Sequence, residues 1–336
     1  MSAASAPEGS AEEGRPAILV IVGPTAVGKS ACALAAAQRF GGEIVSVDSM
    51  QVYRGLDAAT SKPGAEERRS VPHHGLDLAE PGDDFSMGDF VRAAEEAVQG
   101  IAARGRLPIL VGGTGLYLRA FLHGMAEAPR RAPRLRARLN ALAERRGIEW
   151  LHRMLRRLDP ESAARLGPRD RQRLVRALEV RFAARRPLSQ VIASEPFGPD
   201  RHPAVKIGLT MDRRRLYERI DARADAFFAR GLLEEVRELL DRGVPRTANA
   251  FKAIGYREAL DHLDGRATLE AARAETRRRT RNYAKRQGTW FRREPEVAWF
   301  EIDADAAEPF AAPLEHAAAG LGRSGNDPHQ GSGPWA

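Results

Sequence analysis

Apolar and polar positions follow two different patterns along the chain, and each predicts a different element. Residues 17–22 form a continuous apolar run, which is typical of a strand buried on both faces of a parallel sheet. Apolar residues at helical spacing predict helices over residues 29–40 and 90–104. Further strands are predicted over residues 44–47, 107–111, 205–210 and 297–302. Strands and helices that alternate at this spacing predict an α/β fold with a parallel sheet and flanking crossover helices.

The middle of the chain has a different pattern. Residues 130–186 have little β character, and their apolar residues fall at helical spacing, as Leu151, Leu155 and Leu158 do. We therefore predict an all-helical domain inserted between strands of the α/β core. The predicted organisation is a core over residues 16–128 and 198–320, a helical insertion over 129–197, and disordered tails over 1–15 and 321–336 that are rich in Gly, Ser, Ala and Pro.

Positive charge is concentrated in two blocks. Only five of the 53 basic residues are lysine, and the net charge of the 336-residue chain is +8. Residues 130–186 alone carry 18 arginines against six acidic residues, and residues 273–293 carry nine basic residues against one acidic residue. Two such blocks in an otherwise acidic chain are typical of a nucleic-acid groove. A solvated surface face is the structural alternative, and a coding bias towards arginine explains part of the arginine excess.

The composition excludes several classes of protein. A single cysteine, Cys32, excludes a disulfide framework and a cysteine-based zinc site within one chain. No apolar run approaches 18 residues, so we expect no membrane span. The N-terminus carries Glu8, Glu12 and Glu13 and lacks the basic and apolar regions of a signal peptide. We expect a cytoplasmic protein, and a monomer because the chain shows no coiled-coil heptads.

The first predicted strand leads into a phosphate-binding motif. Gly23-Pro24-Thr25-Ala26-Val27-Gly28-Lys29-Ser30 fits the pattern G-x-x-x-x-G-K-[ST], with a buried strand before it and a helix after it. The backbone N–H groups of such a loop surround phosphate oxygens, and Lys29 supplies a positive charge to the terminal phosphates. The Ser30 hydroxyl is a candidate ligand for Mg²⁺. The sequence therefore predicts a P-loop-type sheet that binds a di- or triphosphate.

The acidic residue that usually holds Mg²⁺ in P-loop ATPases is missing from its expected strand. Residues 107–111 lead into Gly112-Gly113-Thr114 instead, which weakens the case for nucleotide hydrolysis. Asp48 is the acid at a strand end that lies near the P-loop in sequence. Because ligands bind at the carboxyl ends of parallel strands, we expect Lys29, Asp48 and Thr114 to meet in one crevice. Spacing alone leaves Asp48 as a metal ligand, a general base or a helix N-cap.

Several further motifs occur in a fixed order. They are Asp48-Ser49-Met50-Gln51-Val52-Tyr53-Arg54-Gly55-Leu56-Asp57, Thr60-x-Lys62-Pro63, Pro72-His73-His74, Phe85-Ser86, Val111-Gly112-Gly113-Thr114-Gly115-Leu116-Tyr117, Gln172-Arg173-Leu174-x-Arg176-Ala177-Leu178-Glu179, Lys252-x-Ile254-Gly255-Tyr256-Arg257 and Thr280-Arg281-Asn282-Tyr283-Ala284-Lys285-Arg286-Gln287-x-Thr289-Trp290-Phe291. With the P-loop, this combination resembles the bacterial tRNA dimethylallyltransferase family over about residues 17–302. The chain departs from the family pattern at Gly75 and Gly288, where we expect slightly looser packing.

The resemblance implies a prenyl transfer with Mg²⁺. The dimethylallyl group of dimethylallyl diphosphate passes to N6 of the adenosine on the 3′ side of the tRNA anticodon, at position 37, and diphosphate is released. Asp48 and Thr114 are the implied catalytic residues: Asp48 accepts the N6 proton or hydrogen-bonds the amine during attack, and Thr114 helps to hold the diphosphate or its bridging oxygen. The implied contacts with the tRNA anticodon stem-loop are Asp48, Ser49, Met50, Gln51, Thr114, Arg136, Gln172, Arg173, Leu174, Val175, Arg176, Lys252, Ala253, Ile254, Gly255, Tyr256, Arg257, Lys285, Arg286, Gln287, Gly288, Thr289, Trp290, Phe291 and Arg292.

Some motif residues have simpler structural interpretations. His73 and His74 are adjacent, so their side chains diverge and a structural loop is favoured over a metal site. A row of apolar residues at helical spacing indicates core rather than a prenyl pocket: Leu216, Ile220, Phe227, Leu232 and Val236. Trp290 and Phe291 suit either base stacking or packing of the last long helix.

Other activities share part of this pattern. An isopentenyltransferase acting on free AMP, ADP or ATP would use the same P-loop and Asp48, but it needs no basic insertion. A small-molecule P-loop kinase would need an acceptor site for the γ-phosphate, with the insertion as a lid. A non-catalytic RNA-binding protein has no use for an intact P-loop. The basic insertion therefore favours tRNA as the acceptor.

Overall fold

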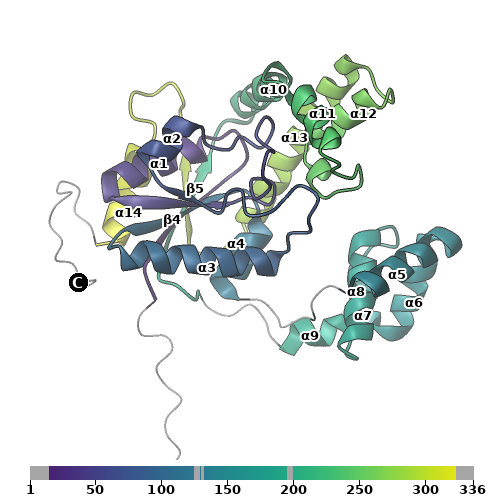
Figure 1. Ribbon diagram of the computed structural model, residues 1–336. Helices are drawn as coiled ribbons and strands as arrows, with labels where there is room; N and C mark the ends of the chain where they lie inside the picture. The colour runs from purple at the N-terminus through teal and green to yellow at the C-terminus, as the bar shows by residue number, and fades with distance from the viewer. Residues whose placement is uncertain (1–14, 125–128, 130–131, 195–199, 323–336) are drawn as a thin grey trace, which may run out of the picture. The chain divides into compact units, whose positions relative to one another are not determined.

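The computed structural model describes residues 15–124, 129, 132–194 and 200–322 (Figure 1). It divides into two compact units, Met1–Phe121 with Asp200–Ala336 and Leu122–Pro199. The predicted tails lie outside the described residues except for Arg15, Leu321 and Gly322. No helix in the described ranges is long and apolar enough to cross a membrane.

The first unit is built on a six-stranded sheet in which every neighbouring pair is parallel. The strands are β1 (Ile18–Val22), β2 (Gly42–Val47), β3 (His73–His74), β4 (Leu107–Gly112), β5 (Ala204–Thr210) and β6 (Val297–Glu301). Their order is β3-β2-β4-β1-β5-β6, so the apolar β1 lies inside the sheet. All five β1 residues are buried, as a strand covered on both faces requires. The predicted α/β parallel sheet is confirmed.

Helices cover both faces of this sheet (Figure 1). They are α1 (Lys29–Phe40), α2 (Ala65–Ser70), α3 (Met87–Ala103), α4 (Gly115–His123) and α14 (Ala311–Gly320). Figure 1 shows α1 and α3 on opposite faces, and both contact β2 and β4. Leu19 and Ile21 of β1 share one core cluster with Ala33 and Ala36 of α1. The alternation of strand side chains thus buries one set of residues under each helical layer.

A group of helices follows β5 within the same unit. It comprises α10 (Arg213–Ala229), α11 (Leu232–Asp241), the short 3₁₀ helix η1 (Ala250–Lys252), α12 (Tyr256–Leu263) and α13 (Leu269–Phe291). The predicted apolar row is buried: Leu216 and Ile220 join the sheet cluster, and Phe227, Leu232 and Val236 join a second cluster with Tyr53 and Tyr256. Phe227 also lines the cleft described below, so the choice of core over pocket is wrong for this residue. Gly231, with φ +89°, separates α10 from α11. The second basic block lies on α13.

The second unit is helical, as predicted for the insertion. Its helices are α5 (Pro133–Arg146), α6 (Ile148–Leu158), α7 (Pro160–Arg165), α8 (Arg171–Ala183) and α9 (Leu188–Ser194). Leu151 and Leu155 of α6 are fully buried against Leu174 and Leu178 of α8 in one core cluster. Most of the described arginines of the first basic block lie on these helices, around a small apolar centre.

Candidate active site

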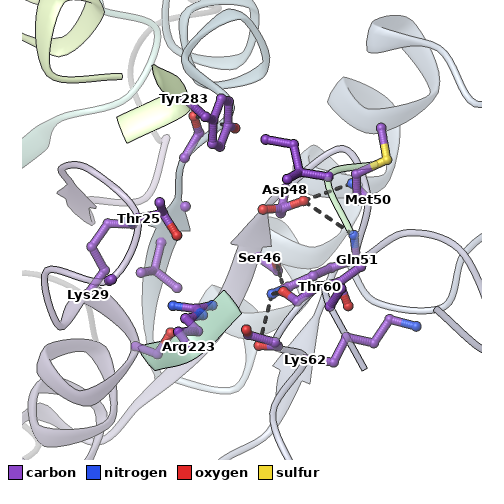
Figure 2. Close-up of a pocket in the computed structure, with 18 of the residues that line it drawn as sticks. Thr25, Lys29, Ser46, Asp48, Met50, Gln51, Thr60, Lys62, Arg223 and Tyr283 are labelled. Carbon is purple, nitrogen blue, oxygen red and sulfur yellow. Dashed lines mark hydrogen bonds between the residues drawn. The ribbon is translucent and has the colours of Figure 1, made fainter. Parts of the chain in front are cut away.

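A cleft of about 640 Å³ opens where the chain leaves β1, β2 and β4 at their carboxyl ends (Figure 2). It lies wholly within the first unit. Thr25 and Lys29 line it from the loop after β1, Asp48 from the loop after β2, and Gly113 from the loop after β4. Its volume falls in the range of small-molecule sites. Lys29 and Asp48 therefore meet in one cleft as expected, whereas Gly113 rather than Thr114 lines it from the loop after β4.

The P-loop has the backbone conformation that its glycines permit. Gly23 and Gly28 have φ values of +145° and +111°. A Cβ at Gly23 would lie 2.5 Å from the carbonyl oxygen of Leu209, so this position has no room for a side chain. Helix α1 begins at Lys29, directly after the loop, and directs its free N–H groups to the cleft. The loop is thus shaped to hold an anion.

Lys29 is held inside the P-loop. Its Nζ donates to the carbonyl oxygens of Gly23 at 2.9 Å and Pro24 at 2.8 Å. Burial lowers the pKa of Lys29 to about 7, and Arg223 adds to this effect while Asp48 opposes it. A bound diphosphate would supply the negative charge that restores the protonated form.

Asp48 follows the last residue of β2. Its Oδ1 accepts hydrogen bonds from the backbone N–H groups of Met50 at 2.8 Å and Gln51 at 3.3 Å. The residues that follow form turns, so the helix N-cap interpretation is wrong. Burial raises the pKa of Asp48, against the two N–H groups and the charges of Lys29 and Arg223. A carboxylate with a raised pKa is a stronger base, and Oδ2 is the oxygen available to a proton donor.

Thr114 is tied to the loop that carries Asp48. Its Oγ1 accepts a hydrogen bond from the backbone N–H of Ser49 at 3.1 Å, and its own N–H donates to the carbonyl oxygen of Val47. Ser49 and Gly113 line the cleft, whereas Thr114 is not among its lining residues. Thr114 therefore joins the loops after β2 and β4.

Three cations of the cleft were missed by sequence reasoning. Arg219, Arg223 and Arg230 all line it, from α10 and the residue after that helix. Arg219 Nε donates to the carbonyl oxygen of Ala26 in the P-loop at 3.0 Å. Burial lowers the pKa of Arg223, opposed by Asp48, and Figure 2 shows its guanidinium in the cleft near Lys29. The spacing i, i+4, i+11 puts the three arginines on one helical face, and this was the available signal.

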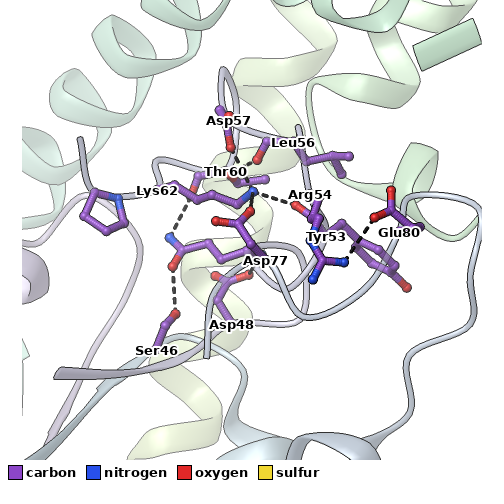
Figure 3. Close-up of polar contacts among 12 residues, drawn as sticks. Ser46, Asp48, Tyr53, Arg54, Leu56, Asp57, Thr60, Lys62, Asp77 and Glu80 are labelled. Atoms are coloured by element: carbon purple, nitrogen blue, oxygen red, sulfur yellow. Dashed lines mark hydrogen bonds and ion pairs between the residues drawn. The ribbon is translucent and has the colours of Figure 1, made fainter. Parts of the chain in front are cut away.

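The outer wall of the cleft is a loop held by buried polar contacts (Figure 3). The Gln51 amide accepts from Ser46 Oγ at 2.7 Å and donates to the carbonyl oxygen of Thr60 at 2.9 Å. Lys62 is only 2% exposed, and its Nζ contacts Asp57 at 2.8 Å and Asp77 at 2.7 Å. These contacts fix the path of residues 50–63 beside Asp48.

The residues expected to contact tRNA divide by burial. Leu174, Val175, Tyr256 and Phe291 are buried in helix cores, so direct contact with RNA is wrong for these four side chains. Ala253 and Gln287 are also buried, and both line the cleft. The exposed members are Gln172, Arg173, Lys252, Arg257, Lys285, Arg286, Thr289, Trp290 and Arg292.

Arg136 and Arg176 have an acidic partner inside the second unit. Glu179 is fully buried, and its Oε2 lies 2.8 Å from Arg136 Nη2 and 2.9 Å from Arg176 Nη1. Arg176 also donates to the carbonyl oxygen of Pro129 at 2.9 Å. Both arginine side chains are partly exposed, at 26% and 31%. Arg136 thereby joins α5 to α8, and Arg176 joins α8 to Pro129, which are structural roles that the sequence did not indicate.

Two expectations around β3 need correction. His73 and His74 form a short edge strand rather than a loop, and they bond to the Val71 carbonyl oxygen and to Glu43. The described residues contain no group of three metal-ligating side chains, so a histidine metal site has no support. Gly75 does not loosen the packing: its φ is +78°, and a Cβ there would lie 2.7 Å from the Ser46 carbonyl oxygen. Gly288 on α13, by contrast, faces open space.

Comparisons with known proteins agree with this geometry. The sequence model of the IPP transferase family matches residues 51–294, and that of isopentenyl transferases matches residues 16–76. The chain is 46% identical over 301 residues to tRNA dimethylallyltransferase 1 of Pelobacter propionicus, covering 90% of this chain and 96% of that protein. It is 50% identical to the tRNA dimethylallyltransferase of Anaeromyxobacter dehalogenans strain 2CP-1, covering 84% and 92%.

Solved structures share the fold. The tRNA isopentenylpyrophosphate transferase of Bacillus halodurans is 41% identical, with a TM-score of 0.67 over 92% of this chain and 97% of that chain. A eukaryotic dimethylallyltransferase acting on tRNA is 25% identical, with a TM-score of 0.77 over 93% and 81%. The isopentenyl transferase match covers residues 16–76, which include the P-loop and Asp48, whereas the IPP transferase match over residues 51–294 covers the rest of the cleft lining and the helical insertion. The chain therefore belongs to the IPP transferase family.

Proposed function

We propose that the protein is a tRNA dimethylallyltransferase, which moves a dimethylallyl group from dimethylallyl diphosphate to N6 of adenosine 37 in tRNA. The observation that carries the proposal is that the P-loop and Asp48 line the same cleft. One side of this cleft suits a diphosphate, and the other offers a carboxylate to an amine. Membership of the IPP transferase family supports the same reaction.

The diphosphate side of the cleft stabilises the leaving group. As the bond between C1 of the prenyl group and the diphosphate oxygen breaks, negative charge grows on that oxygen. The N–H groups at the start of α1 and the cations Lys29, Arg219 and Arg223 are already in place to receive this charge. Preorganised donors of this kind supply the largest electrostatic contribution to such a step.

The carboxylate side activates the acceptor. The N6 amine is a poor nucleophile because its lone pair is delocalised into the adenine ring. As the N6–C1 bond forms, the amine must lose a proton, and Asp48 Oδ2 is the base that takes it. Thr114 keeps the Asp48 loop in position through its bond to the Ser49 N–H. The products are N6-dimethylallyl-adenosine in tRNA, diphosphate and a proton.

A magnesium ion fits the diphosphate side. Mg²⁺ commonly takes only one or two protein ligands and completes its shell with phosphate oxygens and water. Ser30 lines the cleft at the start of α1 and offers a hydroxyl as one such ligand. Such an ion would neutralise charge on the diphosphate.

The acceptor base must leave the anticodon stack to reach the cleft, as base-modifying enzymes generally require. Basic side chains near the cleft suit the surrounding phosphates. Arg286 and Lys252 line the cleft itself, and Lys285 and Arg292 are exposed on and just after α13. We propose that these residues, with Gln172 and Arg173 of α8, bind the anticodon stem-loop.

Transfer of label tests the proposal. Radiolabelled dimethylallyl diphosphate and Mg²⁺ are offered with bulk tRNA and, separately, with AMP, ADP or ATP. Label in tRNA alone is the expected result. Label in free nucleotides would identify the adenylate enzyme instead, and consumption of ATP without transfer would identify a kinase.

A further inference from the structure

Gln287 lines the cleft and is almost fully buried. It is 5% exposed on the inner side of α13. Its Oε1 accepts a hydrogen bond from the backbone N–H of Thr25 in the P-loop at 2.8 Å, and its Nε2 donates to the carbonyl oxygen of Gly113 at 3.0 Å. One carboxamide therefore joins the loop after β1 to the loop after β4.

The two partners determine what the side chain must be. A backbone N–H can only donate and a carbonyl oxygen can only accept, so the orientation of the Gln287 amide is fixed by the residues it meets. An ionised glutamate could accept from Thr25 but could not donate to Gly113, and methionine could do neither. A Cβ at Gly113 would lie 2.0 Å from Gln287 Nε2, so the glycine makes room for the amide.

Further hydrogen bonds link helix α13 to the loop that carries Asp48. Tyr283, one helical turn before Gln287 on α13, donates its hydroxyl to the same Gly113 carbonyl oxygen at 3.3 Å. The next residue, Thr114, accepts from the Ser49 N–H, and Ser49 follows Asp48. Helix α13 thus holds the P-loop on one side of Gln287 and the Asp48 loop on the other.

We propose that Gln287 is a positioning residue, which sets the distance between the diphosphate held by the P-loop and the base Asp48. The inference rests on the proposed prenyl transfer. The reaction needs the breaking C1–O bond and the amine to be aligned at the same moment, because a misplacement of about 1 Å costs about 10²-fold in rate. Binding of either substrate alone does not depend on this distance. Loss of Gln287 should therefore lower kcat and leave KM almost unchanged.

The experiment compares Gln287→Met and Gln287→Glu with the wild type in steady-state and single-turnover prenyl transfer. Gln38→Met is the matched control, because Gln38 is an exposed glutamine on α1. We expect both Gln287 variants to lower kcat about 10- to 100-fold, with KM for tRNA and for dimethylallyl diphosphate within about threefold of wild type. Gln38→Met should match the wild type, and thermal unfolding reports whether each variant is folded.

The pH dependence separates positioning from simple loss of stability. In the Gln287→Glu variant, a protonated carboxyl group regains the donor that the Gly113 carbonyl oxygen needs, whereas an ionised one lacks it. The rate of Gln287→Glu relative to wild type should therefore rise as pH falls, and that of Gln287→Met should not. If Gln287→Met does not fold, the pH dependence of the rate of Gln287→Glu relative to wild type still tests the positioning role.

Three results would count against the inference. They are wild-type kcat in a folded Gln287 variant, a ratio for Gln287→Glu that is independent of pH, and a rise in KM for tRNA alone, which would indicate RNA contact. Absence of transfer by the wild type itself would instead overturn the proposed function.

Discussion

Glu179→Gln is expected to destabilise the helical second unit by about 3 kcal/mol at neutral pH. Glu179 is the buried acid of α8 that holds Arg136 and Arg176. Its Oε1 also accepts the backbone N–H of Ala132 at 2.8 Å. A neutral amide at this position keeps the volume but loses the charge that the two guanidiniums and the N–H group stabilise.

The magnitude follows from the pKa of Glu179. Burial opposes its ionisation, but hydrogen bonds from Arg136, Arg176 and Ala132 outweigh burial and lower the pKa from 4.5 to about 2. The lowering of the Glu179 pKa from 4.5 to about 2 corresponds to about 3–3.5 kcal/mol, since one pKa unit is worth about 1.4 kcal/mol. Because the folded pKa is the lower one, this stability is fully present above pH 4.5 and is lost as pH falls towards 2.

The assay is denaturant unfolding of the full chain, with hydrogen exchange of the α5 and α8 amides to localise the change. Glu144→Gln is the control, because Glu144 forms an exposed pair with Arg171 in the same unit and should change stability by less than about 0.5 kcal/mol. The difference between wild type and Glu179→Gln should shrink between pH 4.5 and pH 2. The reasoning is refuted if Glu179→Gln and Glu144→Gln are equally stable at pH 7. It is also refuted if the stability difference between wild type and Glu179→Gln is unchanged at low pH.

Three further predictions concern the first unit. Burial lowers the pKa of Lys29 to about 7, so kcat/KM for dimethylallyl diphosphate should fall as pH rises above 7. Lys29→Arg stays charged and should remove this decline, and a decline that persists in Lys29→Arg would contradict the assignment to Lys29. Gly288→Ala should stabilise the protein by about 0.5–1 kcal/mol in denaturant unfolding, because the methyl group meets nothing within 4 Å and glycine is unfavourable inside a helix; destabilisation would disprove this. Lys62→Met should cost about 1–3 kcal/mol in thermal unfolding because it removes the buried cation that Asp57 and Asp77 share and leaves Asp77 with Arg68 alone, whereas Arg54→Met at an exposed pair should cost almost nothing. Equal losses would contradict a stabilising role for the buried Lys62.

Most of the sheet could be predicted because its strands are apolar and bounded by motifs. The apolar run of β1 predicts a buried strand, and the glycines of the P-loop predict its turns. The predicted strand ends lie within a few residues of those observed. β2 begins two residues earlier than predicted because Gly42 and Glu43 pair with Leu107 and Pro108 of β4, a contact that local pattern does not reveal. β3 was missed because two histidines have no strand periodicity.

The part of the candidate site that could be predicted is the part formed by the P-loop motif and Asp48. The P-loop and Asp48 meet because parallel strands end at one edge of the sheet. The partners of arginines were not predictable in a chain where arginine is so abundant. Packing alone decides that Arg223 faces the cleft and that Arg136 faces Glu179. Gln287 belongs to a basic block, yet the helix turns it inward to the P-loop.

The most direct test of the central claim is the single-turnover rate of prenyl transfer by Asp48→Asn with tRNA and dimethylallyl diphosphate both saturating. The asparagine keeps an oxygen for the Met50 and Gln51 N–H groups but cannot take the N6 proton. The account predicts a rate about 10²- to 10⁴-fold below wild type, with both substrates bound as tightly as before. A rate within about threefold of wild type would contradict the assignment of Asp48 as the base.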